Sequence, residues 1–281
     1  TPAMTTSAVQ LFKPRDGYRT TVGTEYLRPH VEYYLPSVPD GAVKIEILDS
    51  LGKTVNAYSS DMPVATSGRG GRGGRGAGAG GDPVVADPDN PDAGGGGRGR
   101  GGTAPPRVTK DAGLNRFVWD VQYAGGLGAP PARYQARLTA GSTVLTQTFT
   151  LRIDPCLADE GVTATDLQAQ FAHNTWMREL NAEANAAVAR TRAAETRLRG
   201  ATGAAADTLT KVQAISAKLL TEPVRYGKPG LQAHISYLAG MTSRGDQKVG
   251  RDALERFAVL RKELDAIKLE LVRVLGPETR M

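Results

Sequence analysis

Histidine and cysteine, which often carry catalysis or bind metals, are scarce in this chain of 281 residues. It has three histidines, His30, His173 and His234, and one cysteine, Cys156. Metal-binding helical bundles use Glu-x-x-His pairs, and no histidine here has a glutamate at that offset. One cysteine allows neither an internal disulfide nor a multi-cysteine zinc site. We therefore predict no catalytic residue, cofactor or metal. We interpret His173 and His234 as helix-face residues and Cys156 as a small buried residue after a strand.

Oxygen-bearing side chains gather in one short segment, DPDNPDAG, at residues 87–94. Calcium loops alternate Asp or Asn ligands and usually end on a distal Glu. Here two prolines intervene and no Glu follows, so solvated turn residues are the favoured interpretation. Calcium binding by Asp87, Asp89 and Asp92 stays an open alternative.

The stretch SGRGGRGGRGAGAGGDP begins a segment, residues 68–102, that holds 16 glycines and 5 arginines. An RGG-type nucleic-acid arm stacks bases on aromatic side chains, and this segment has no Phe, Tyr or Trp. Nucleic-acid binding is therefore disfavoured. The composition predicts a loop without packing of its own. Either it is a disordered loop, or contact with another subunit or an anionic surface orders it through the forked donors of its arginines. Those partner-binding candidates are Arg69, Arg72, Arg75, Arg98 and Arg100.

Three further partner-binding candidates lie in the second half of the chain. Arg190 and Arg197 belong to a cluster of arginines near the end of a long expected helix. They either complement the helix dipole or form a docking surface for an anionic partner. Trp176, on the same helix, is either an anchor for a partner or a core residue.

The first half of the chain has the pattern of a β-protein. Apolar residues alternate in short runs from residue 31 onward, and turn sequences divide 42–59 and 132–154 into hairpins. We expect residues 1–30 to be an extended segment. Residues 31–157 are expected to form an antiparallel β-sandwich of the Ig-like or fibronectin-III-like kind, interrupted by the loop at 68–102.

After Pro155 the hydrophobic period changes from two to about 3.6 residues, which predicts helices. Thr163 and Asp166 have the spacing of a capping box at the first helix. Residues 158–281 are therefore expected to form an all-α antiparallel bundle, and the chain as a whole is expected to be a two-domain α+β protein. The four expected helices run over 163–199, 207–220, 231–241 and 249–275.

Three segments carry a resemblance to known families: GAVKIEILDSLGKTV at 41–55, AGLNRFVWDVQYAGG at 112–126 and ARYQARLTAG at 132–141. They resemble the Ig-like domains of flagellar hook-cap type. With LFKPRDGYR at 11–19 and DLQAQF at 166–171, nearly the whole chain resembles the region after the propeller in bacterial secreted sortilin-like proteins with Asp-box repeats. The resemblance implies a periplasmic or extracellular location, after removal of a signal peptide or a longer N-terminal region. The propeller, where that family's site would lie, is absent, so no catalytic residue carries over.

Three function classes are compatible with these patterns. The first is a non-catalytic accessory or scaffold subunit whose partners are other proteins, including an envelope membrane complex of respiratory, photosynthetic or secretion type. The second, which rests on how the resembled family is labelled, is a fragment of a secreted propeller hydrolase of glycosidase type. The third is RGG-type nucleic-acid binding. The net charge of +6 disfavours this class, because the charge is spread along the chain rather than concentrated in one segment. No apolar run approaches the ~20 residues of a transmembrane helix.

Overall fold

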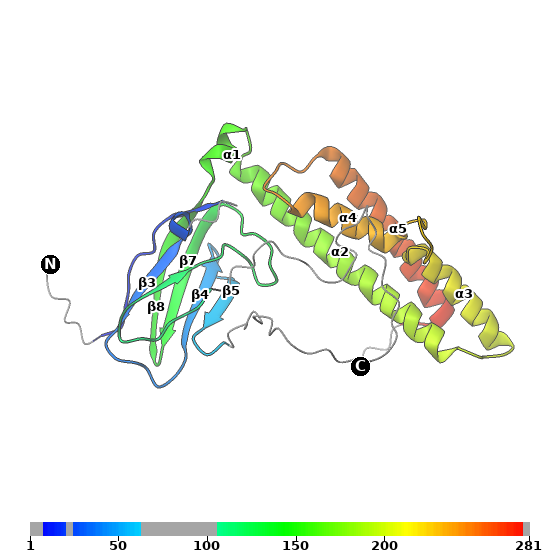
Figure 1. Ribbon diagram of the computed structural model, residues 1–281, viewed down its shortest axis with the longest axis horizontal. Helices are drawn as coiled ribbons and strands as arrows, with labels where there is room; N and C mark the ends of the chain where they lie inside the picture. Colours follow the sequence, from blue (N-terminus) through cyan, green and yellow to red (C-terminus); the bar gives the residue numbers. More distant parts are fainter. Residues whose placement is uncertain (1–7, 21–24, 63–105, 278–281) are drawn as a thin grey trace, which may run out of the picture. The chain divides into compact units, whose positions relative to one another are not determined.

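The computed structural model describes residues 8–20, 25–62 and 106–277. Within them the chain is an α+β protein whose strands lie before Asp154 and whose α-helices lie after it (Figure 1). It divides into two compact units, Thr1–Ile153 and Asp154–Met281. The Gly/Arg-rich segment at 68–102 lies outside the described residues, so the predictions made for it stay predictions.

The first unit contains two sheets that share one hydrophobic core. The smaller sheet has the order β1-β3-β6, and the larger, curled sheet has the order β2-β8-β7-β4-β5 (Figure 1). The strands are β1 Gln10–Leu11, β2 Gly17–Arg19, β3 His30–Leu35, β4 Val43–Asp49, β5 Thr54–Ser59, β6 Gly113–Val118, β7 Ala132–Ala140 and β8 Thr143–Ile153, with a 3-10 turn η1 at Glu25–Leu27.

Both expected hairpins are present, because their turns carry strong local signals. Between β4 and β5, an Asp49 carboxylate oxygen accepts the N–H groups of Leu51 and Lys53, each at 2.9 Å. Gly52 adopts φ +81°, a conformation that favours glycine. The β7–β8 hairpin buries alternate side chains of β7, as its period of two predicts.

The segment at residues 1–30, which we expected to be extended, contributes two short strands where the structure describes it. β1 joins the smaller sheet and β2 joins the larger one. β2 also runs parallel to β8, which departs from the all-antiparallel pairing that we expected. After β1 the chain crosses from the smaller sheet to the larger one. There β2 pairs with the edge of β8 and runs in the same direction as β8. Gly17 makes this route possible, since it lies against Pro29 with no room for a Cβ atom.

The second unit contains five helices among its described residues. The capping box is confirmed: the Thr163 hydroxyl accepts the N–H of Asp166 at 3.1 Å, and the Asp166 carboxylate accepts the N–H of Thr163 at 3.0 Å. A short first helix was not anticipated; it begins at Pro155, next to the N-capping Asp154. The helices are α1 Pro155–Asp159, α2 Ala164–Arg197, α3 Ala204–Leu219, α4 Leu231–Ser243 and α5 Arg251–Leu275.

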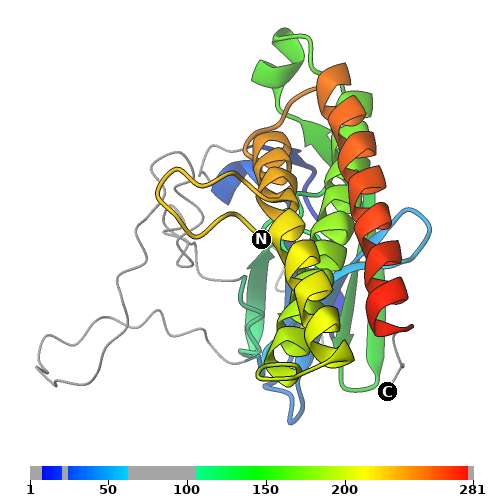
Figure 2. The ribbon, with the colours of Figure 1, turned by 90° about the vertical axis from the view of Figure 1, so that its right-hand side faces the viewer.

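The direction of the helices differs from a fully antiparallel bundle. α3 and α4 follow one another alongside α2 and run against it, so α5 returns in the direction of α2 (Figure 2). The contacts agree: Trp176 near the start of α2 meets Phe257 near the start of α5, and Arg190 meets Gly276 at the far end. α2 and α5 are therefore parallel neighbours.

Candidate functional site

Four residues of α2 occur at intervals of seven: Trp176, Glu183, Arg190 and Arg197. Seven residues fall only about 20° short of two full helical turns. The four side chains therefore follow one slowly drifting line along α2, which we call the α2 stripe. Its first three members contact α5 or the residue that caps it. The α2 stripe and the facing residues of α5 are the candidate functional site.

The first member, Trp176, lies at the surface rather than in the core. Its ring stacks on Phe257 of α5, with ring centroids 6.1 Å apart and 29° between planes. Phe257 also makes a T-shaped contact with His173, with ring centroids 5.7 Å apart. Trp176 remains 50% exposed, and Leu254, one turn earlier on α5, is 44% exposed. The core interpretation of Trp176 is therefore wrong, and an oriented aromatic ring faces solvent.

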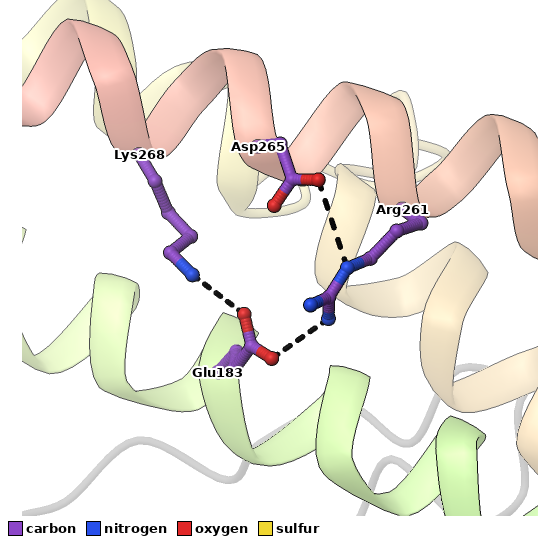
Figure 3. A network of polar contacts seen from close by, with 4 residues as sticks. All are labelled: Glu183, Arg261, Asp265 and Lys268. Atoms are coloured by element: carbon purple, nitrogen blue, oxygen red, sulfur yellow. Dashed lines mark hydrogen bonds and ion pairs between the residues drawn. The ribbon is translucent and has the colours of Figure 1, made fainter.

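The second member, Glu183, connects α2 to two turns of α5 (Figure 3). One carboxylate oxygen accepts from Arg261 at 2.7 Å, and the other accepts from Lys268 at 2.6 Å. Arg261 also pairs with Asp265, one turn further along α5, at 3.6 Å. The two cations are seven residues apart, so α5 presents them on one line opposite Glu183.

This network consists of fixed charges. The hydrogen bond from Lys268, and then that from Arg261, lowers the pKa of the Glu183 carboxyl. The hydrogen bond to Glu183 in turn raises the pKa of the Arg261 guanidinium. A carboxyl with a lowered pKa stays ionised at neutral pH and makes a poor general acid. The arrangement holds two helices together and presents charge two turns along α2 from Trp176.

The remaining members of the α2 stripe differ in environment. Arg190 is half-buried and donates to the carbonyl of Gly276, just past the last turn of α5. This bond satisfies a carbonyl at the end of a helix, where intrahelical partners run out. Arg197 is exposed in the last turn of α2 and has no ion pair within the part of the chain that the structure describes. Of the two arginines of the α2 stripe, Arg197 is thus the one whose guanidinium has no partner among the described residues.

Most of the other predicted site residues cannot be placed relative to the α2 stripe. The five arginines of the Gly/Arg-rich segment, Arg69, Arg72, Arg75, Arg98 and Arg100, lie outside the described residues, as do Asp87, Asp89 and Asp92. Cys156 is exposed in α1, which corrects the expectation of a buried residue. Over 8–20, 25–62 and 106–277 no group of three or more His, Cys, Asp or Glu side chains could hold a metal ion, and no helix in those ranges could span a membrane.

Sequence reasoning missed Glu183 and its partners on α5. A signal was present in the sequence, because Glu183 lies seven residues from each of two partner-binding candidates, Trp176 and Arg190. No protein-family model and no curated protein sequence matches the chain.

Proposed function

We propose that this chain is a non-catalytic accessory or scaffold subunit of a periplasmic or cell-surface assembly. The observation that carries the proposal is the half-exposed Trp176 ring, held on Phe257 at the head of the α2 stripe. Tryptophan is enriched among the residues that dominate protein–protein binding energy. A ring that already stacks on a neighbouring side chain loses little conformational entropy on binding. More of the free energy gained by burying the ring therefore contributes to affinity. The ion pairs of Glu183, two turns along α2, fit the polar rim that surrounds such anchors.

We also propose that the first unit is an Ig-like sandwich and the second a helical bundle, as in the region after the propeller of sortilin-like proteins. The Tyr134 hydroxyl donates to the carbonyl of Pro130, four residues upstream, at 2.7 Å. A hydrogen bond of this kind, the tyrosine corner, recurs in Ig-like sandwiches. The buried Trp119 packs edge-on against Tyr134 and Phe149, at 5.1 and 5.9 Å, which fits the aromatic core of such domains.

Incorporation into an assembly tests this function. The full chain, with a small tag, is expressed in its source cells and the envelope fraction is separated on a native gel. We expect the chain to migrate in a larger particle of fixed stoichiometry and to be released by Trp176→Ser. Losing an anchor costs about 2 kcal/mol or more, which is about thirtyfold in Kd.

The matched control is Tyr237→Ser, which removes an aromatic ring that is 64% exposed on α4. This variant should be incorporated like the wild-type chain. A chain that stays monomeric in every fraction contradicts the proposal. Turnover of a glycoside, peptide or ester by the purified chain, abolished by one polar substitution, favours the hydrolase fragment instead.

A further inference from the structure

A cavity of about 300 Å³ opens on the smaller sheet of the first unit, and no residue of the α2 stripe lines it. It is bordered by the segment that follows β1, by the turn η1, and by side chains of β3 and β6. Three of its side chains are cationic and one is a carboxylate. The lining residues are Lys13, Arg15, Tyr26, His30, Glu32 and Arg116.

A β-bulge aims two of these cations. Phe12 and Arg15 donate their N–H groups to carbonyls of β3, at 3.0 and 3.3 Å. In a regular antiparallel ladder the second bond would come from residue 14, but Pro14 has no N–H. The extra residue forms a bulge, a device that re-aims side chains. Pro14 is buried, and Lys13 and Arg15 on either side of it are exposed.

Two carboxylates close to these cations, Glu32 and Asp16, are already engaged. One oxygen of Glu32 accepts from Nε of Arg116 at 3.0 Å and from its Nη2 at 2.5 Å. Asp16 accepts the N–H of Thr150 at 2.9 Å and pairs with Arg152 at 3.0 Å.

These pairings leave the cations only partly compensated, because Asp16 serves both Arg152 and Lys13. Across residues 8–20, 25–62 and 106–277, neither Lys13 nor Arg15 forms a side-chain ion pair. Glu32 pairs with Arg116, so the side chains that line the cavity carry a net positive charge from Lys13 and Arg15, which Asp16 offsets in part.

We infer that this cavity binds an organic anion that carries carboxylate groups. Arg15 offers a forked donor that matches a carboxylate, and Lys13 offers a point charge beside it. Arg116 is oriented by Glu32 through one edge and keeps its Nη1 nitrogen for the ligand. The ring of Tyr26, which is 75% exposed, offers apolar surface to the body of the ligand.

The volume of the cavity distinguishes an organic anion from an inorganic one. About 300 Å³ lies at the lower end of small-molecule sites, which is more room than a single phosphate fills. The carboxylates can belong to a small molecule or to an acidic peptide segment, because the same donors recognise both.

Isothermal titration of the full chain at low ionic strength tests the site with three probes: glutarate, an amidated and acetylated hexaglutamate peptide, and inorganic phosphate. We expect both carboxylate probes to bind more tightly than phosphate. Tighter binding of the peptide identifies a protein segment as the source of the carboxylates, and tighter binding of glutarate identifies a small molecule.

The double substitution Lys13→Gln, Arg15→Gln should weaken glutarate binding at least about tenfold, which corresponds to the loss of one charge-assisted hydrogen bond. Both side chains are exposed, so the fold should persist. The control Arg133→Gln removes an exposed cation of β7 outside the cavity and should change the affinity less than about twofold. The inference is overturned if no probe binds, if phosphate binds as tightly as glutarate, or if the control weakens binding as much as the double substitution.

Discussion

His173 should make the helical unit sensitive to mild acid. Its side chain is 1% exposed, and neither ring nitrogen has a hydrogen-bond partner among the described residues. Burial lowers the pKa of this imidazole below its usual value near 6.5. The folded unit therefore holds a neutral ring, whereas the unfolded chain takes up a proton once the pH falls below about 6.5.

The sign and limit of the effect follow from this difference. Because the pKa of His173 is lowered in the folded state, its contribution to the free energy of unfolding is fully present above pH 6.5. This contribution is lost as the pH falls below 6.5. One proton changes the free energy of unfolding by at most about 1.4 kcal/mol per pH unit. The largest loss between pH 6.5 and 5 is therefore about 2 kcal/mol, before most carboxylates begin to titrate.

Replacing the imidazole ring of His173 tests whether its protonation causes the loss of stability in mild acid. His173→Leu removes two unpartnered nitrogens, so it should raise stability at pH 7 by about 1 kcal/mol or more. It should also flatten the acid dependence between pH 6.5 and 5. Urea titrations followed by circular dichroism at 222 nm measure both quantities, since the α-helices of the described chain all lie in the second unit. The control is His234→Gln, an exposed position on α4 that should retain the acid dependence.

Two results would refute this reasoning. One is a wild-type chain whose unfolding midpoint does not fall relative to His173→Leu between pH 7 and 5. The other is a His173→Leu variant that is less stable at pH 7, which would mean that a ring nitrogen has a partner.

Three further substitutions test other contacts. Gly17→Ala should lower the melting temperature of the first unit, because a Cβ atom collides with Pro29; an unchanged melt would contradict that close approach. Glu183→Gln should cost about 0.5–1 kcal/mol in urea titrations at low salt, since its partners are partly exposed, and less at ~1 M salt; an equal cost at both would exclude an ionic origin. Tyr134→Phe leaves the Pro130 carbonyl without its donor and should cost about 1–2 kcal/mol, measured by intrinsic fluorescence; no loss would show that the bond contributes nothing.

Locally encoded features were predictable from the sequence. The capping box at Thr163 and the turn at Gly52 involve residues within four positions of one another, so their spacing alone identifies them. The buried alternation of β7 is equally direct, because one face of a strand meets the core.

Features that depend on tertiary pairing were not predictable. β1 and β2 have two and three residues, too few for any period, and they exist because β3 and β8 offer free edges. The partners of Glu183 lie 78 and 85 residues away in the sequence. The parallel direction of α2 and α5 follows from the way in which α3 and α4 both pack antiparallel to α2. The hydrophobic period of a helix carries no information about this packing.

The return path alongside α2 consists of two helices, and this has a consequence for local opening. α3 attaches to α5 through Lys218 and Glu270. α4 attaches to α2 through Gln170, whose amide donates to the carbonyls of Thr242 and Gly245. Because no continuous backbone helix joins α3 to α4, we expect that one can detach and exchange its amide protons while the other stays docked. We therefore expect each end of α2 to become accessible at a free-energy cost of its own.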